Sequence, residues 1–282
     1  MRALITNDDG IESEGLHVLA RAVEQAGFDV TVIAPSYNAS GTGASLGHLS
    51  IDTPIQYTEC PIEGLSGKAY ALNGPPALCT ITGHLEGLGP APDLVVSGIN
   101  AGLNTGRSVL HSGTVGAALA AQNFGIRGIA VSLDTADAWY WETAGALTAQ
   151  LLPTLIGGPE RCMLNLNVPA LPREDIKGIR WAGLAAFGSV RSQITDATHG
   201  QLFFDLVETD YEPPIESDLG LVRSGYAAIT ALHGTSEVWH DAALPGHDFE
   251  ASHGIPGAAA AHRLKASDAI LLSISQSSNL IR

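Results

Sequence analysis

Cysteine is scarce in this sequence, and its spacing supports neither a disulfide framework nor a structural metal site. Three cysteines, Cys60, Cys79 and Cys162, occur in 282 residues, without a C-x-x-C pair and without histidines at zinc-ligand spacing. We therefore expect small buried thiols in a reducing compartment.

Basic residues are also few. The chain has 14 Lys and Arg against 29 Asp and Glu, which gives a net charge of -15 at pH 7. Such a surface repels polyanions and offers no basic stripe for a nucleic-acid backbone, so we expect no nucleic-acid polymer as a partner. A small phosphorylated ligand remains compatible with this charge, because a metal ion and a helix N-terminus can bind it locally.

Long apolar runs are missing as well. Only four residues separate Arg2 from Asn7, which is too short for the apolar core of a signal peptide, and no later run reaches membrane-spanning length. We expect a cytoplasmic protein with no membrane partner.

The 45% of apolar residues is enough for a substantial core, and the length fits one main domain.

Short apolar segments alternate with helical patterns along the first 170 residues. Strands are predicted at residues 2–6, 28–34, 93–97, 128–133 and 162–168, and helices from Ser13 to the stop at Gly27, at 113–124 and at 135–152. This alternation predicts a three-layer α/β/α fold with a mostly parallel sheet. We expect a long functional loop at residues 36–47 and irregular or β-rich chain at 48–76.

After about residue 175 the alternation gives way to short strands and turns. Residues 257–262 and the strand-like 269–275 are predicted to form an arm that packs on the core or on another subunit. The sequence leaves these two alternatives open.

Two adjacent carboxylates, Asp8 and Asp9, follow the first predicted strand, at the edge where open α/β sheets place their ligands. On a regular strand they would point to opposite faces, so a turn through Gly10 is needed to aim both at one site. Close carboxylates repel unless a proton or a cation intervenes, and oxygen ligands favour Mg²⁺ or Mn²⁺. Taken alone, the pair is more typical of a polar turn that caps a helix.

Two further oxygen donors follow parallel strands. Ser40 comes after the second predicted strand, and Asn100 comes after the strand at 93–97. If the three strands are parallel, their ends bring two carboxylates, a hydroxyl and an amide oxygen together, which suits an octahedral cation with bound waters.

Ser112-Gly113-Thr114 opens the helix predicted at 113–124, with Ser112 placed as its N-cap. A helix N-terminus attracts phosphate through its unpaired N–H groups and its partial positive charge. Capping by serine is common, so this feature indicates a phosphate site only beside a metal site.

Four strings, ITNDDGI, APxxNxSG, SGINxGxN and SGTVGAA, occur in this order at separations that resemble those of the SurE family of metal-dependent nucleotidases and acid phosphatases. The likeness is strong over roughly the first half of the chain and weaker beyond it, where LNLNVP and the region around Gly225-Tyr226 still fit. It implies a Rossmann-like core at about 1–180 and a C-terminal extension at about 181–282, within a single SurE-like domain over 1–282. It also implies homodimers or homotetramers in which C-terminal segments are exchanged between subunits.

The resemblance further implies specific roles for single residues. The implied ligands of a divalent metal, Mg²⁺ or Mn²⁺, are Asp8, Asp9, Ser40 and Asn100. The implied phosphate pocket is lined by Asn104, Ser112, Gly113 and Thr114. The implied reaction is the hydrolysis of nucleoside 5′- or 3′-monophosphates, and we predict that Asp8 or Asp9 takes the proton of the attacking water.

The chain departs from the family pattern at several positions. Ser108 and His111 stand where an acidic residue and an aromatic often precede SGT, and residues 73–79 read NGPPALC where GTPxDC is common. Two interpretations of His111 stay open: a proton donor to the leaving group, and a partly exposed histidine without a catalytic part. Arg107 is more typical of a solvated charge than of a phosphate ligand. The aromatic run at 139–141 is more typical of packing than of base stacking.

The sequence offers four alternatives to this function and mechanism. Gly43-Ala44-Ser45-Leu46-Gly47 matches the G-x-S-x-G of serine esterases, but extended chain rather than a helix is predicted to follow Ser45. An aspartyl-phosphate mechanism remains possible, although adjacent aspartates lack its usual alternate spacing. A non-catalytic, metal-dependent nucleotide sensor is the third alternative. A dinucleotide site at residues 41–43 is disfavoured, because those glycines open no helix.

Overall fold

The computed structural model describes residues 1–208 and 210–236, and residues 1–232 form one compact unit. Both segments of the predicted C-terminal arm, 257–262 and 269–275, lie outside the described residues. Within the described residues, no helix has the length and apolarity needed to cross a bilayer.

A nine-stranded sheet, ordered β3-β4-β2-β1-β5-β6-β7-β11-β8, forms the centre of this unit. All neighbouring pairs from β4 to β7 are parallel, whereas β3 and β11 pair antiparallel with β4 and β7. The prediction of a mostly parallel sheet is therefore confirmed. The strands are β1 (Arg2–Thr6), β2 (Asp29–Pro35), β3 (Tyr57–Glu59), β4 (Lys68–Leu72), β5 (Leu94–Ala101), β6 (Arg127–Leu133), β7 (Met163–Val168), β8 (Ile179–Trp181) and β11 (Ala227–Ala231).

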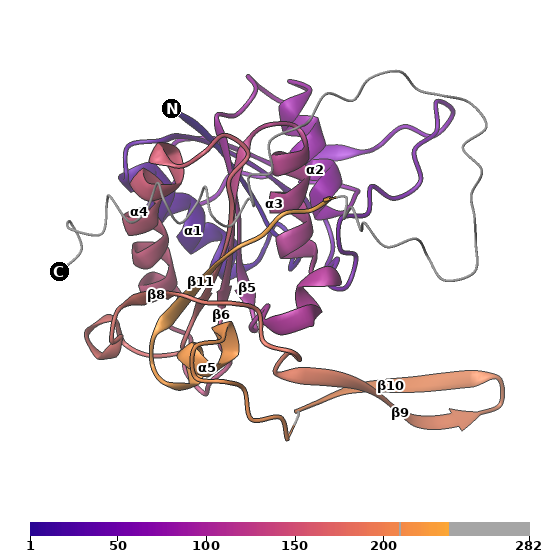
Figure 1. The fold of residues 1–282 in the computed structure, drawn as a ribbon. Helices are drawn as coiled ribbons and strands as arrows, with labels where there is room; N and C mark the ends of the chain where they lie inside the picture. The colour runs from indigo at the N-terminus through magenta and orange to yellow at the C-terminus, as the bar shows by residue number, and fades with distance from the viewer. Residues whose placement is uncertain (209, 237–282) are drawn as a thin grey trace, which may run out of the picture. The chain divides into compact units, whose positions relative to one another are not determined.

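Helices cover both faces of the sheet, which gives the predicted three layers (Figure 1). One face packs against α1 and α4 and the other against α2 and α3, so each face buries its own apolar cluster. A further helix, α5, lies beside β11 (Figure 1). The helices are α1 (Glu14–Gln25), α2 (Pro76–His84), α3 (Gly113–Asn123), α4 (Trp141–Gly157) and α5 (Asp218–Arg223), with short 3-10 turns η1 (Gly106–Leu110) and η2 (Arg173–Asp175).

The ends of α1 and α3 follow from their sequence. Ser13 caps α1 by accepting the Leu16 N–H, and Gly27 follows the helix at a φ of +92° that favours glycine. Gly125 plays the same part after α3, with a φ of +80°. Both helices therefore lie where local signals predicted them.

The helix predicted at 135–152 is displaced. α4 begins at Trp141 and continues to Gly157, through the exposed Pro153. A proline inside a helix normally ends it, because one N–H is lost and the ring meets the preceding turn. Here the helix continues because Leu152 and Leu155 are completely buried against the sheet while the proline ring faces solvent.

Residues 48–76 contain the short strands β3 and β4, as the β-rich prediction allowed, and α2 then begins at Pro76. Proline at the first helical position is favoured, because the N–H it lacks would have no helical partner there.

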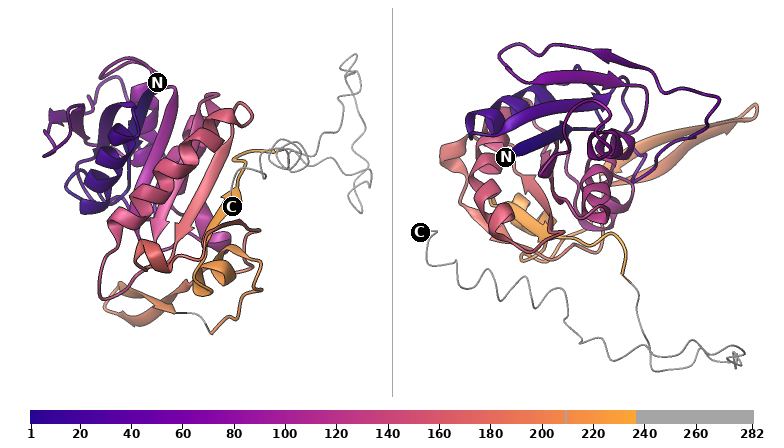
Figure 2. Two further views of the ribbon diagram at one scale, coloured as in Figure 1. Left: turned by 90° about the vertical axis from the view of Figure 1, so that its left-hand side faces the viewer. Right: turned by 90° about the horizontal axis from the view of Figure 1, so that it is seen from above.

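Two strands, β9 (Val190–Thr198) and β10 (Gln201–Glu208), form a separate antiparallel hairpin that projects from the main sheet (Figures 1 and 2). Every residue of β9 is exposed, and apolar side chains such as Ile194, Phe204 and Leu206 stand in solvent. A lone two-stranded hairpin is marginally stable in water. Its apolar surface is therefore available for contact with another molecule.

Candidate active site

The predicted ligands converge where the order of the sheet changes direction. β1 lies between β2 and β5 and is parallel to both, so the carboxyl ends of all three strands meet at one edge. Asp8 and Asp9 follow β1, and Ser40 follows β2. Such a switch point is where open α/β sheets bind ligands.

The turn after β1 is held by the completely buried side chain of Asn7. Its Nδ2 donates to the Gly10 carbonyl at 3.0 Å and to the Ser13 hydroxyl at 2.8 Å. The Gly10 N–H donates back to the Asn7 Oδ1 at 3.2 Å. Gly10 has a φ of +105°, which a residue with a side chain rarely adopts. This turn brings the carboxylates of Asp8 and Asp9, which lie between Asn7 and Gly10, to the same cavity.

Asp8 is nearly enclosed, at 3% exposure. The Thr114 hydroxyl donates to its Oδ1, and the backbone N–H groups of Gly113 and Thr114 also bond to it. Burial raises the pKa of Asp8 above its ordinary value, and these hydrogen bonds oppose the rise only in part. The start of α3 is therefore directed at Asp8.

Gly113 makes this approach possible. A Cβ atom at this position would lie 2.7 Å from the Asp8 Cβ and 2.8 Å from its Oδ2. Carbon atoms do not approach so closely without displacement, so only glycine lets α3 start against the carboxylate.

Asp9 is more open than Asp8. Burial and the neighbouring Asp8 charge raise its pKa to about 6, although an N–H from Ala101 at 3.3 Å partly offsets them. Two adjacent carboxylates with raised pKa values would gain from a cation between them, because a cation favours the ionised forms of both.

Asn100 lies inside β5 rather than in a loop after it, because the strand continues to Ala101 beyond a register shift between Ser97 and Asn100. Its Nδ2 donates to the Gly102 carbonyl at 2.6 Å. That bond turns the amide nitrogen toward the backbone, and Oδ1 accepts no hydrogen bond within the described part of the chain. Ser40 is exposed, and its N–H is fixed by the Asn38 Oδ1 at 3.0 Å.

An open cavity of about 860 Å³ joins most of the predicted residues. Gly113 and Thr114 are not part of its lining, and Thr114 is completely buried behind Asp8. The predicted residues that line the cavity are Asp8, Asp9, Ser40, Asn100, Asn104 and Ser112. Ser112 also accepts the Val115 N–H at 3.1 Å, which confirms it as the N-cap of α3.

Asn104 is fixed by buried side chains from β6 and β7. Its N–H donates to the Asn167 Oδ1 at 2.9 Å, and its Nδ2 donates to the Ser132 hydroxyl at 2.9 Å. Its carbonyl accepts from the Nδ2 atoms of Asn165 and Asn167 at 2.8 and 3.0 Å. The asparagines of LNLNVP, alternating along a buried strand, were the signal in the sequence for this support.

The far wall of the cavity was not predicted. It comes from the chain before the β9–β10 hairpin, from the base of the hairpin and from the chain after it. Its residues are Phe187, Gly188, Val190, Arg191, Ser192, Leu206, Asp210 and Tyr211. Local sequence gave no signal for these positions, because contacts between distant segments, such as residues 185–188 against η1, bring them to the site.

The secondary candidates separate into two groups. Arg107 and His111 are exposed and line the same cavity. Trp139 and Trp141 stack on each other at 4.6 Å, and neither lines the cavity. Ser45 is exposed, and no helix follows it, so the nucleophile elbow of a serine esterase is not formed.

The donor set suits a hard divalent cation. In the part of the chain that the structure describes, no three His, Cys, Asp or Glu side chains gather at one place. A cation at this edge would therefore be held by the carboxylates of Asp8 and Asp9 together with neutral oxygens from Ser40 and Asn100. All four donors are oxygens, which matches the preference of Mg²⁺ and Mn²⁺.

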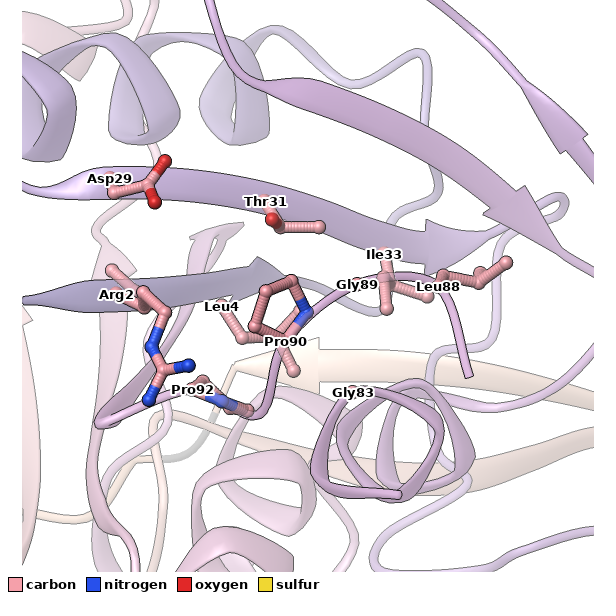
Figure 3. Close-up of a pocket in the computed structure, with 11 residues that line it drawn as sticks. Arg2, Leu4, Asp29, Thr31, Ile33, Gly83, Leu88, Gly89, Pro90 and Pro92 are labelled. Carbon is pink, nitrogen blue, oxygen red and sulfur yellow. The ribbon is translucent and has the colours of Figure 1, made fainter. Parts of the chain in front are cut away.

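A second, much smaller cavity of about 20 Å³ lies between β1, β2, the end of α2 and the segment at 88–92 (Figure 3). It has room for about one water molecule. Its lining is largely apolar, with Leu4, Ile33 and Pro90 among the side chains, and it contains none of the predicted site residues.

Comparisons with known proteins show the family and support the fold. A family model described as "Survival protein SurE" matches residues 3–189. The chain is 36% identical over 236 residues to the 5′-nucleotidase SurE of Desulfitobacterium hafniense, covering 83% of this chain and 91% of that protein. It is 36% identical over 240 residues to the 5′/3′-nucleotidase SurE of Erwinia tasmaniensis, covering 83% and 90%. The crystal structure of the SurE protein from Aquifex aeolicus matches with a TM-score of 0.68 and 30% identity, over 83% of this chain and 93% of that one.

Proposed function

The chain belongs to the SurE family, and on that premise we propose that it is a divalent-metal-dependent phosphomonoesterase that hydrolyses nucleoside monophosphates to nucleoside and phosphate. The relatives named 5′-nucleotidase and 5′/3′-nucleotidase support this substrate class. The observation that carries the proposal is the shared cavity, in which two carboxylates, a hydroxyl and an amide from three parallel strands face one space.

Asp8, Asp9, Ser40 and Asn100 are the proposed metal ligands, with Mg²⁺ or Mn²⁺ as the ion. When bound, such an ion supplies Lewis acidity that polarises a phosphoryl oxygen and acidifies a water. The raised pKa values of the two carboxylates support this assignment, because a cation would relieve the repulsion that burial intensifies.

The chain's own residues would orient the reacting groups. Asp9 is the more open of the two carboxylates and is the proposed acceptor of the proton from the attacking water. Thr114 holds Asp8 in one orientation from behind, through a hydroxyl that is itself buried. Asn104 and Ser112 line the cavity beside the carboxylates and are the proposed contacts of the phosphate.

Two arginines offset the negative field of the chain at this site. Arg107 and Arg191 both line the cavity and are exposed. Among the described residues the only salt bridge joins Arg2 to Asp93, so neither cavity arginine is engaged by a carboxylate there. Both are therefore available to attract a phosphate dianion toward the site.

Phosphate release is the direct test. Purified protein would be assayed with 5′- and 3′-nucleoside monophosphates, sugar phosphates and short polyphosphate, with Mg²⁺, with Mn²⁺ and with EDTA. Metal-dependent release from nucleoside monophosphates is expected. Binding without release would favour the non-catalytic sensor, and release that persists in EDTA would contradict the metal-dependent mechanism.

We also propose a quaternary structure for this protein. We propose a homodimer or homotetramer, and the exposed apolar side chains of the β9–β10 hairpin support an interface between subunits. A cytoplasmic location remains a prediction from the sequence. Sedimentation velocity would measure the subunit number, and a monomer at micromolar concentration would contradict the proposed assembly.

A further inference from the structure

We propose that Phe187 and Tyr211 form an aromatic wall that binds the nucleobase of the substrate, an inference that rests on the nucleotidase function proposed above. Both side chains line the cavity that contains Asp8 and Asp9. They come from outside the strands that carry the carboxylates, since Phe187 precedes the hairpin and Tyr211 follows it. The aromatic wall is therefore a second, chemically distinct side of the same cavity.

The two rings form a fixed pair rather than two independent side chains. Their centroids are 5.3 Å apart and their planes meet at 82°, an edge-to-face arrangement that stabilises both. The Tyr211 hydroxyl also accepts the Ala186 N–H at 3.3 Å, and its carbonyl accepts from the Arg223 guanidinium at 3.0 Å. Phe187 nevertheless remains 58% exposed and lines the cavity, so it keeps surface that a ligand can contact.

A buried carboxylate fixes the chain before Phe187 against η1, which lies on the polar side of the site. Asp218 is 1% exposed, and its Oδ2 accepts the Gly106 N–H while its Oδ1 accepts the Ala185 N–H, both at 2.8 Å. Gly106 belongs to η1, between Asn104 and His111 in the chain. Asp218 is thus a positioning residue that ties the aromatic wall to η1.

The backbone contact between these segments is close. Gly106 has a φ of +57°, and a Cβ atom there would lie 2.4 Å from the Phe187 carbonyl oxygen. A Cβ on Gly188 would lie 2.8 Å from the Ser108 hydroxyl. These approaches pack the backbone of residues 187–188 directly against η1, so the Phe187 side chain leaves the chain beside η1.

The chemistry of this wall fits a base better than a phosphate. A flat exposed ring offers dispersion and π contact to any heterocycle, whereas a phosphate needs cations or N–H donors. The cavity of about 860 Å³ is within the size range of small-molecule sites and is much larger than a phosphate needs. Stacking is tolerant of base identity, so the wall predicts a preference for nucleotides over sugar phosphates rather than for one base.

The test compares substrates that differ only in the base. Steady-state kinetics on the metal-loaded enzyme would use AMP and ribose 5-phosphate, and equilibrium binding would use adenosine, which has no phosphate to hydrolyse. In Phe187→Ala, the ratio of kcat/KM for AMP to that for ribose 5-phosphate should fall about 5- to 100-fold, and adenosine binding should weaken by a similar factor. Phe187→Trp, which keeps an aromatic face, should retain both the substrate ratio and the adenosine binding of the wild type.

Trp139→Ala is the matched control, because Trp139 is also an exposed aromatic but does not line the cavity. Its substrate ratio should stay within twofold of the wild type. An unchanged ratio in Phe187→Ala, or adenosine binding equal to that of the wild type, would overturn the aromatic wall. If the wild type released no phosphate but bound adenosine in a Phe187-dependent way, the proposed hydrolysis would fail and the wall would stand. No adenosine binding to the wild type would overturn the wall even if phosphate were released.

Discussion

The hydroxyl of Thr114 donates a 2.5 Å hydrogen bond to the Oδ1 of Asp8, across 106 positions of sequence. This bond joins the turn after β1 to the first turn of α3, where Thr114 is completely buried and Asp8 is 3% exposed. The carboxylate thereby keeps a fixed orientation, with its other oxygen near Gly113. The proposed ligand set therefore depends on a threonine that does not itself line the cavity.

Replacing Thr114 by valine should destabilise the protein and impair the site. The valine keeps the volume but leaves a buried carboxylate without its side-chain donor, which costs about 1–3 kcal/mol. The pKa of Asp8 would rise further, because the lost bond is one that lowers it. Urea denaturation measures the free energy of unfolding, and phosphate release measures the site.

Thr148→Val is the control for that variant. Thr148 is also completely buried, but its hydroxyl donates to the Ala144 carbonyl within α4, away from the cavity. Its activity should stay within about twofold of the wild type. Equal activity and stability of Thr114→Val and the wild type would show that the bond to Asp8 has no role.

Adding one methyl group at Gly113 should displace α3 from Asp8. Gly113→Ala would place a Cβ 2.7 Å from the Asp8 Cβ, and overpacking of this kind costs about 1–3 kcal/mol. Gly157→Ala is the matched control, since Gly157 is a helical glycine with nothing within 4 Å of its Cβ position. Thermal unfolding should show a lower Tm for Gly113→Ala and an equal or higher Tm for Gly157→Ala. The reverse order would contradict the described approach of α3.

Asp9→Asn should abolish most of the activity without unfolding the protein. The substitution keeps the shape of the side chain but removes the charge of a proposed metal ligand and proton acceptor, so kcat should fall by about 100-fold or more. Its stability without metal should be unchanged or higher, because a partly buried charge beside Asp8 is removed. Full activity at saturating Mg²⁺ or Mn²⁺ would refute the assignment of Asp9.

The stabilisation by metal should depend on pH. The folded-state pKa of Asp9 is about 6, above its ordinary value of 3.8, so between these values the folded protein binds more protons than the unfolded one. Without metal, this group therefore favours folding at low pH, and that stability is lost as the pH rises through 6. A cation binds the ionised form, so the rise in Tm on adding Mg²⁺ or Mn²⁺ should grow from pH 5 to pH 7. A constant rise over this range would contradict the raised pKa.

Asp218→Asn should weaken the attachment of η1. The carboxylate accepts the N–H groups of Gly106, Ala185 and Leu219, and an amide replaces one acceptor oxygen by a donor group. The expected loss is about 1–3 kcal/mol of unfolding free energy, together with a higher KM for AMP. Asp93→Asn is the control, since that exposed carboxylate pairs with Arg2 at the surface and should cost less than about 1 kcal/mol. Equal KM values for Asp218→Asn and the wild type would remove its positioning role.

Local signals in the sequence predicted the elements around β1, β2 and β5 because capping and periodicity act within a few residues. Ser112 is the N-cap that the sequence predicted, α1 begins after Ser13 as predicted, and the turn through Gly10 brings Asp8 and Asp9 to one cavity. The extent of α4 was mispredicted, because burial of Leu155 outweighs the helix-breaking tendency of Pro153. Tertiary packing of this kind cannot be read from a window of sequence.

The second side of the cavity could not be predicted for a related reason. Phe187, Tyr211 and Asp218 have no motif around them. Phe187 and Asp218 contact Gly106 of η1, about 80 and 112 positions earlier in the chain, and Tyr211 packs on Phe187. The excluded role of Ser45 was predictable, because the absence of a helix after it is a local property.

Anomalous diffraction from crystals grown with Mn²⁺ tests the central claim most directly. A single strong peak is predicted at the carboxyl ends of β1, β2 and β5, within about 2.0–2.4 Å of oxygens from Asp8, Asp9, Ser40 and Asn100. A cavity without a peak, or a peak that those four side chains do not contact, would contradict the account.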